Sequence, residues 1–220
     1  MNPQLLALLI FLGILLVLIG ISELLYQFFK LKAETSRKFL HVSGGLTCLL
    51  LPTFFNSHWW ILALTSSAFL LLLSTFIMNM LQSVHKTKRK SIGSVIFPIP
   101  VYCCFLAASS LHNNLLFYLP VSLLAISDTS AEIAGTRWGY LTKQFFNGQK
   151  TLAGTLAFFG TAILICFCWL WYYDLPVQSI IAGAFVISIF ASLAELFTLK
   201  GWDNLTIPLI AGVIIWVIIK

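Results

Sequence analysis

The chain has 220 residues, of which 60% are hydrophobic and only 9% charged, and it includes 7 Trp and 19 Phe. This composition excludes an ordinary soluble domain of the same size and indicates an integral membrane protein. Lys and Arg total 13 against 7 Asp and Glu. No basic run with interleaved aromatic residues accompanies this surplus, so we expect no nucleic-acid partner.

Apolar stretches long enough to cross a membrane follow one another along the whole chain. At about 20 apolar residues per crossing, we expect about eight transmembrane spans. In chain order they are residues 4-21, 39-55, 59-81, 92-110, 115-135, 151-173, 177-197 and 204-219. The first is followed by further spans and has no Lys or Arg before it, which favours a transmembrane helix over a cleaved signal. The prediction is one all-α domain over residues 1-220, a polytopic helical bundle.

The basic residues fall on alternate loops between these spans. Lys and Arg occur in loops 22-38, 82-91, 136-150 and 198-203, and none occurs near 56-58, 112-114 or 174-177. By the positive-inside rule, the basic loops face the cytoplasm and both termini face out. We therefore expect a multi-pass protein of a cell membrane, with the bacterial inner membrane as the expected location.

An acid pair interrupts the fifth predicted span. Asp128 and Glu132 lie one helical turn apart, on the same helix face as Gly135. A carboxylate at the centre of a membrane helix costs roughly 2.5 to 3.5 kcal/mol even on a lenient scale, so function is the default explanation for such residues. Carboxylate oxygens, completed by phosphate oxygens and water, suit Mg²⁺. A structural pair neutralised by a neighbouring cation and a proton relay are the alternatives.

Glycines and cations follow the acid pair. Glycines let the backbone approach an anion, and a lysine with a hydroxyl residue at a helix start can meet phosphate with both charge and N–H groups. The residues of this candidate phosphate site are Gly135, Arg137, Gly139, Lys150, Thr151 and Gly154.

Other unusual polar residues fall on the same predicted side of the membrane. They are Arg37, Lys38 and His41 at the second span, Gly93 and Ser94 at the fourth, Glu195 at the end of the seventh, and Asp203 and Asn204 at the start of the eighth. We expect these segments to converge with the acid pair on one site at the cytoplasmic face.

Four ordered motifs resemble those of the CTP-dependent polyprenol kinase family, which includes phytol kinase, dolichol kinase and a CTP-dependent diacylglycerol kinase. They are RKFLHVSGG (37-45), SIGSVIFPI (91-99), SDTSAEIAGTRWGY with KTLAGTLAFF (127-159) and ELFTLKGWDNLTIPL (195-209). The compact length is most similar to that of phytol kinases. Ser127 stands where many members have Gly.

The resemblance implies transfer of the γ-phosphate of CTP to the hydroxyl of an isoprenoid or lipid alcohol, with a divalent cation. Asp128 and Glu132 would hold the metal, Lys150 and Arg137 would counter phosphate charge, and Arg37 and Lys38 would contact the nucleotide or product. Glu195 or Asp203 would orient or deprotonate the alcohol, with His41 as the competing base.

Three alternatives stay open at this point. The central motif is also similar to that of phosphatidate cytidylyltransferase, which would release pyrophosphate from CTP, and the acceptor could be diacylglycerol. A transporter built around an intramembrane acid pair is the least favoured, because the outer halves of the spans are almost purely apolar. The sequence names neither the acceptor alcohol nor the oligomeric state.

Overall fold

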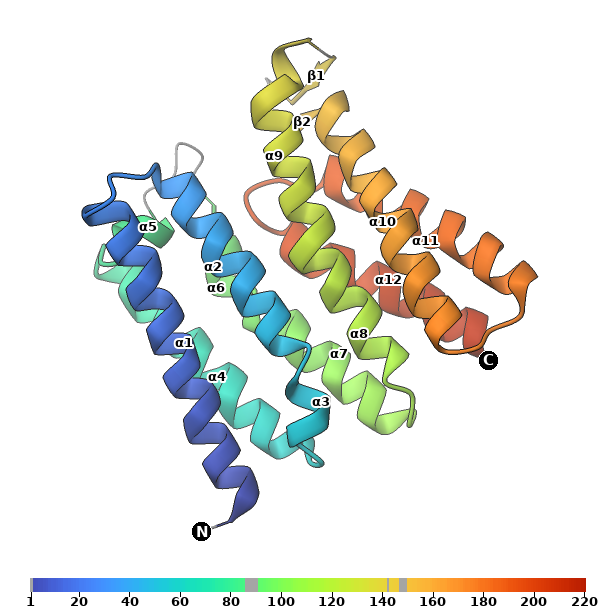
Figure 1. Ribbon diagram of the computed structural model, residues 1–220, viewed down its shortest axis with the longest axis horizontal. Helices are drawn as coiled ribbons and strands as arrows, with labels where there is room; N and C mark the ends of the chain where they lie inside the picture. The colour runs from blue at the N-terminus through green and yellow to red at the C-terminus, as the bar shows by residue number, and fades with distance from the viewer. Residues whose placement is uncertain (1, 86–90, 142, 147–149) are drawn as a thin grey trace.

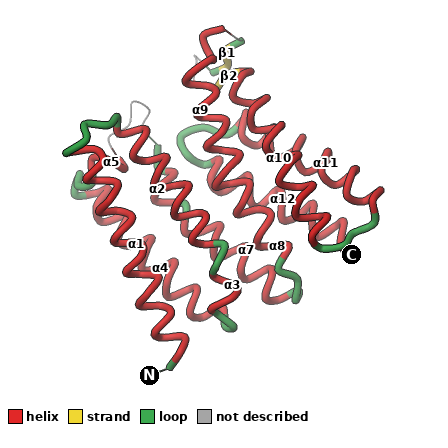
Figure 2. The backbone as a smooth tube through the Cα atoms, viewed as in Figure 1, coloured by secondary structure: helices red, strands yellow, loops and turns green. Residues whose placement is uncertain are grey.

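The computed structural model describes residues 2-85, 91-141, 143-146 and 150-220. The chain runs through α1 (Pro3–Gln27), α2 (Ala33–Cys48), α3 (Leu51–Phe54), α4 (His58–Ile77), α5 (Gln82–His85), α6 (Gly93–Ile96), α7 (Pro98–Ser110), α8 (Leu115–Ser122), the π-helical segment η1 (Leu123–Ser127), α9 (Asp128–Trp138), the 3₁₀ turn η2 (Gly139–Leu141), β1 (Gln144–Phe145), β2 (Lys150–Thr151), α10 (Leu152–Tyr172), α11 (Val177–Phe197) and α12 (Asp203–Ile219). Figures 1 and 2 show that helices dominate this order.

Six helical segments of the described chain are long and apolar enough to cross a membrane. They are Pro3–Gln27, His58–Ile77, Gly93–Ser110, Leu115–Leu141, Leu152–Tyr172 and Val177–Phe197. The predicted spans 39-55 and 204-219 coincide with α2 plus α3 and with α12, whose longer helices have 16 and 17 residues. The fold is therefore a polytopic membrane helical bundle, and the count of eight spans stays a prediction.

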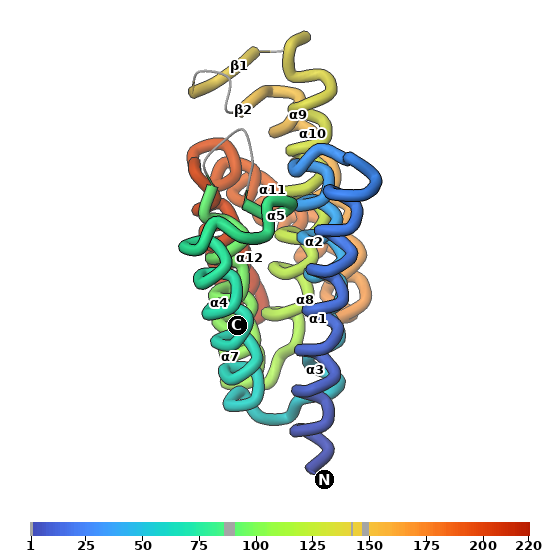
Figure 3. The backbone as a smooth tube through the Cα atoms, turned by 90° about the vertical axis from the view of Figure 1, so that its left-hand side faces the viewer, coloured from blue at the N-terminus to red at the C-terminus, as the bar shows by residue number. Residues whose placement is uncertain are grey.

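The long helices run side by side along one direction of the molecule (Figures 1 and 3). Both termini lie away from the end that carries the β1–β2 hairpin and the α1–α2 connection (Figure 1). This agrees with an even number of crossings. Assignment of the hairpin end to the cytoplasm rests on the loop charges and stays a prediction.

The C-terminal half forms the tightest packing. α10 packs against α9 and α11, and α11 packs against α12. Their buried side chains include Phe158 of α10, Ile187 of α11 and Ile215 of α12, which are fully buried. A rigid core of this kind can hold charged side chains at its end in fixed positions.

A small antiparallel hairpin departs from the all-α prediction. Gln144 pairs with Thr151, and Phe145 pairs with Lys150. Lys150 thus lies in a strand, whereas the sequence analysis placed it at a helix start. Thr151 caps α10 instead, since its hydroxyl accepts a hydrogen bond from the Gly154 amide at 3.1 Å. The pairing fixes Lys150 just ahead of the helix.

Glycines allow α9 and α10 to lie close together. A Cβ atom at Gly154 would meet the Ala131 carbonyl oxygen at 2.9 Å, and one at Gly139 would meet Thr151 Cγ2 at 2.7 Å. From the sequence, we expected these glycines to let the backbone come close to a bound anion. The structure gives them a packing role as well, because any side chain there would push the two helices apart.

We expect Gly154→Ala to destabilise the protein by about 1 to 3 kcal/mol through overpacking. Gly160→Ala is the matched control in the same helix, because a Cβ atom there meets nothing within 4 Å. It should leave stability unchanged or raise it, since Ala is the better helix former. Thermal unfolding in detergent measures both; equal melting temperatures for the two variants would contradict the close packing.

Candidate active site

One large cavity of about 930 Å³ opens at the hairpin end of the bundle. Five of the seven acidic residues of the chain line it, namely Glu34, Asp128, Glu132, Glu195 and Asp203. Among the described residues, five basic side chains also line it: Lys32, Arg37, Lys38, Lys150 and Lys200. The predicted convergence of polar segments from α2, α9, α11 and α12 is thus present in the structure.

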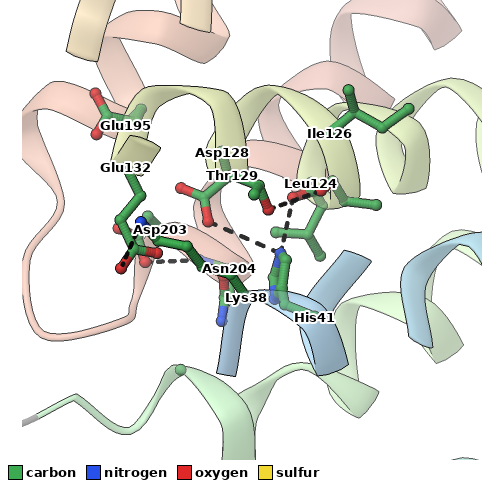
Figure 4. Close-up of polar contacts among 12 residues, drawn as sticks. Lys38, His41, Leu124, Ile126, Asp128, Thr129, Glu132, Glu195, Asp203 and Asn204 are labelled. Atoms are coloured by element: carbon green, nitrogen blue, oxygen red, sulfur yellow. Dashed lines mark hydrogen bonds and ion pairs between the residues drawn. The ribbon is translucent and has the colours of Figure 1, made fainter. Parts of the chain in front are cut away.

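The π-helical segment η1 positions the first acid of the pair. In η1 the Asp128 amide donates to the Leu123 carbonyl, so the Leu124 carbonyl lacks its usual partner within an α-helix. His41 of α2 forms a hydrogen bond with this carbonyl, and its Nε2 atom lies 2.9 Å from the Leu124 oxygen. Because a carbonyl can only accept, Nε2 carries the hydrogen. The same atom lies 3.8 Å from Asp128 Oδ2, as Figure 4 shows.

The second acid of the pair faces two cations of α2. Arg37 Nη2 lies 3.1 Å and Lys38 Nζ 3.8 Å from Glu132 Oε1. All three side chains are partly exposed to the cavity, so these ion pairs contribute little to stability. They do fix α2 across the cavity from α9, and they leave two cations next to the acid pair.

The third cluster is a buried ion triad. Lys150 Nζ lies 2.6 Å from Glu195 Oε1 and 3.0 Å from Asp203 Oδ2. Burial lowers the pKa of Lys150, but the carboxylates of Asp203 and Glu195 outweigh this effect and raise the pKa above its usual value. This shift favours the charged form of Lys150. Glu195 is only 5% exposed, and its Oε2 atom has no hydrogen-bond partner among the described residues.

The connection between α11 and α12 closes one side of the cavity. Gly201 has a φ of +93°, and the Lys200 carbonyl accepts a hydrogen bond from the Ile92 amide at 3.0 Å. A Cβ atom at Gly93 would lie 2.6 Å from the side-chain amide nitrogen of Asn204. Gly93 therefore lets the start of α6 pack on the start of α12. It supports the cavity wall without lining the cavity.

The structure brings most, but not all, of the predicted residues to the cavity. Those that line it are Arg37, Lys38, His41, Ser94, Asp128, Glu132, Gly135, Gly139, Lys150, Thr151, Gly154, Glu195, Asp203 and Asn204. Arg137 does not: its side chain is exposed and its guanidinium lies 5.3 Å from the Trp138 ring centroid. Its predicted role in countering phosphate charge is not supported, because it occupies the other face of α9.

Sequence reasoning missed other lining residues. Lys32 and Glu34 lie at the start of α2, and Lys200 lies in the loop between α11 and α12. Their only signal is position beside a motif, since single charges in polar loops are common at membrane surfaces. η1 also escaped notice, because its residues are as apolar as those of an ordinary helix.

The acid pair is the candidate metal site. The described side chains include no group of three or more His, Cys, Asp or Glu arranged to hold a metal. Asp128 and Glu132 do line the cavity together from one helix face. Two carboxylates with the remaining positions open to water and phosphate suit Mg²⁺, which rarely takes an all-protein cage.

The chain was compared with known proteins. No protein-family model and no solved structure matches it. It is similar to a phytol kinase from Synechocystis sp., with 26% identity over 221 residues, which covers 98% of this chain and 94% of the relative. The similarity extends over nearly the whole chain and so takes in all four motif segments. It agrees with the resemblance of the four motifs to those of the polyprenol kinase family, and the chain is similar to a phytol kinase over nearly its whole length.

Proposed function

We propose that this protein is a membrane-embedded kinase that transfers the γ-phosphate of CTP to the hydroxyl of an isoprenoid alcohol. One observation carries the proposal: a single cavity joins a charged end, lined by five acids and five cations, to an interior lined by apolar helix faces. A charged nucleotide and a water-insoluble alcohol need a meeting place of this kind. The similar protein from Synechocystis is a phytol kinase, which supports a lipid alcohol as acceptor. CTP as the donor comes from the family resemblance.

Charge balance supports a metal requirement. Among the described residues, the five carboxylates and five Lys or Arg side chains that line the cavity are equal in number, so a bound triphosphate would bring negative charge that these side chains do not balance. Asp128 and Glu132 would hold a divalent cation, which when bound neutralises charge on the phosphates. Arg37 and Lys38 would then exchange part of their contact with Glu132 for the phosphate oxygens. The planar guanidinium of Arg37 suits this exchange, because it can form two parallel hydrogen bonds with either a carboxylate or a phosphate.

Lys150 supplies fixed positive charge. Glu195 and Asp203 hold its ammonium at 2.6 and 3.0 Å, so it needs no rearrangement when charge builds on the transferring group. Preorganised charge in a water-poor site is a main source of catalysis. In this proposal, the role of Glu195 and Asp203 in the triad is to hold the ammonium of Lys150 in position.

The three candidate bases differ in their free atoms. Asp203 has both carboxylate oxygens engaged, one by Lys150 and the other by the Asn204 amide at 3.1 Å. His41 donates from Nε2 to Leu124, so the ring could take a proton only at Nδ1. Glu195 keeps Oε2 without a partner. The geometry favours Glu195 or His41 over Asp203 as the group that receives the hydroxyl proton.

The proposed activity is tested with purified protein in detergent, Mg²⁺ and CTP labelled at the γ-phosphate, with phytol, geranylgeraniol, farnesol and diacylglycerol as acceptors. Label should move to an isoprenoid alcohol, and ATP should be a poorer donor. Release of pyrophosphate with phosphatidate, without labelled alcohol, would identify a cytidylyltransferase instead. No turnover of CTP with any acceptor would contradict the proposal.

Asp128→Asn should lower kcat by at least about 100-fold, the order expected when a preorganised electrostatic group is lost. The amide keeps the shape of the side chain, so the melting temperature should change little. Asp174→Asn is the control, because Asp174 is an exposed acid outside the cavity. The γ-phosphate transfer assay with a Mg²⁺ titration measures both variants; wild-type kinetics in Asp128→Asn would refute the metal role.

Lys150→Met should cost about 3 to 5 kcal/mol of stability, because it leaves buried carboxylates without their cation. Activity should fall as well. The double variant Lys150→Met with Glu195→Gln removes one orphaned charge, so it should regain stability but not turnover. Lys143→Met, an exposed lysine outside the cavity, is the control. Recovery of turnover in the double variant would show that Lys150 has only a structural role.

A further inference from the structure

The cavity continues from its charged end into the bundle, between the N-terminal helices. α1, α2 and α4 each present one side-chain stripe to it at helical spacing. Representative members are Leu15 and Leu18 of α1, Gly44 and Thr47 of α2, and Leu64 and Ala68 of α4. These stripes line the cavity. Apolar helix faces that line a space inside a membrane protein need an apolar occupant, because neither water nor charge is stabilised there.

The apolar part begins at the candidate reaction centre. His41 lines the cavity and contacts Asp128 on one side, and its ring packs edge-on against Phe97, with centroids 5.0 Å apart, on the other. Leu40 and Gly44, next to it on α2, already belong to the apolar wall. A molecule with a hydroxyl at one end and a hydrocarbon body would therefore place the hydroxyl near Asp128 while its body enters the bundle.

The apolar part also has a closed end. Leu51 and Phe11 line the cavity at its far end and are 1% and 7% exposed. Phe11 packs against Phe54 and Phe55, with centroid separations of 5.7 and 5.6 Å. Phe11 and Leu51 therefore form the apolar wall at this end of the cavity.

The length of this part limits the occupant. From His41 to Leu51 the chain advances ten residues along α2 and the start of α3, or about 15 Å at 1.5 Å per residue. An extended chain advances about 3.5 Å per three bonds, so a four-bond isoprene unit takes about 4.7 Å and about three units fit below the hydroxyl. A long polyprenol exceeds this space many times over.

We propose that this apolar part of the cavity, from His41 to Leu51 between α1, α2, α4 and α7, encloses about three isoprene units of the acceptor's hydrocarbon tail and selects a short isoprenoid alcohol over a long polyprenol. The inference rests on the proposed kinase activity. The acceptor class is then farnesol, geranylgeraniol or phytol, and not an undecaprenol or dolichol.

Gly44 offers a sharp test of the tail site. It lines the cavity, and a Cβ atom there meets no other atom within 4 Å, so a side chain can begin there without a clash at its Cβ atom. Gly45, the next residue, cannot be used, because its Cβ atom would collide with Ala125. Gly13→Leu is the matched control: it also lies in a helix with open space around its Cβ position, but it is exposed on α1 and outside the cavity.

Kinetics with geraniol, farnesol, geranylgeraniol and a long polyprenol should be measured for the wild type and both variants. The wild type should prefer farnesol or geranylgeraniol and phosphorylate the long polyprenol poorly. Gly44→Leu should lower kcat/KM for farnesol and geranylgeraniol by about tenfold or more, the scale on which apolar pockets discriminate. Gly13→Leu should keep the wild-type profile. A Gly44→Leu profile that matches the wild type, or efficient use of the long polyprenol, would overturn the tail site.

A binding experiment separates this inference from the proposed activity. A geranylgeraniol analogue with a diazirine at its far end, photolysed in the wild type, should label peptides of α1, α3 or α4 near Phe11, Leu51 or Leu64. Excess unlabelled geranylgeraniol should suppress the labelling. Labels confined to the outer helix faces would refute the tail site even if the kinase assay succeeds. Internal labelling without turnover of CTP would retain the tail site and refute the kinase proposal.

Discussion

Burial of one ammonium group between two carboxylates is the interaction on which the site depends. Lys150 connects the β1–β2 hairpin to Glu195 at the end of α11 and to Asp203 at the start of α12. Removing charges from water is expensive, and such a group is stable only when its partners are held close. The tightly packed helices α9 to α12 hold them in this way. The triad therefore fixes the ends of three helices around the same cavity.

The rest of the site follows from this arrangement. α9 packs on α10 through glycines, which brings Asp128 and Glu132 to the cavity that the triad borders. η1 leaves the Leu124 carbonyl for His41, which ties α2 to the acid pair. α2 then forms both the charged wall, with Arg37 and Lys38, and the apolar wall, with Gly44 and Thr47. One helix thus links the part suited to a nucleotide with the part suited to a hydrocarbon chain.

The sequence predicted the helices well and the contacts less well. All eight predicted spans coincide with helical segments, because a helix lets a run of about 20 apolar residues satisfy all its backbone hydrogen bonds within one segment. The convergence of motifs was also predictable from loop charge. The ion-pair partner of each charged residue could not be predicted. Arg137 and Lys150 both looked like phosphate-binding cations in the sequence, yet Arg137 is exposed beside Trp138 and Lys150 is buried between two acids. Side-chain direction around a helix end and the switch to π geometry at η1 depend on packing with distant segments, which a local pattern does not contain.

The most direct test of the account is an experimental structure of the protein with Mg²⁺ and a CTP analogue whose γ-phosphate cannot be transferred. The account predicts that the triphosphate lies in the cavity, with a cation at Asp128 and Glu132 and with Lys150 next to the γ-phosphate while still held by Glu195. A nucleotide bound outside this cavity, or phosphates that contact neither the acid pair nor Lys150, would contradict it.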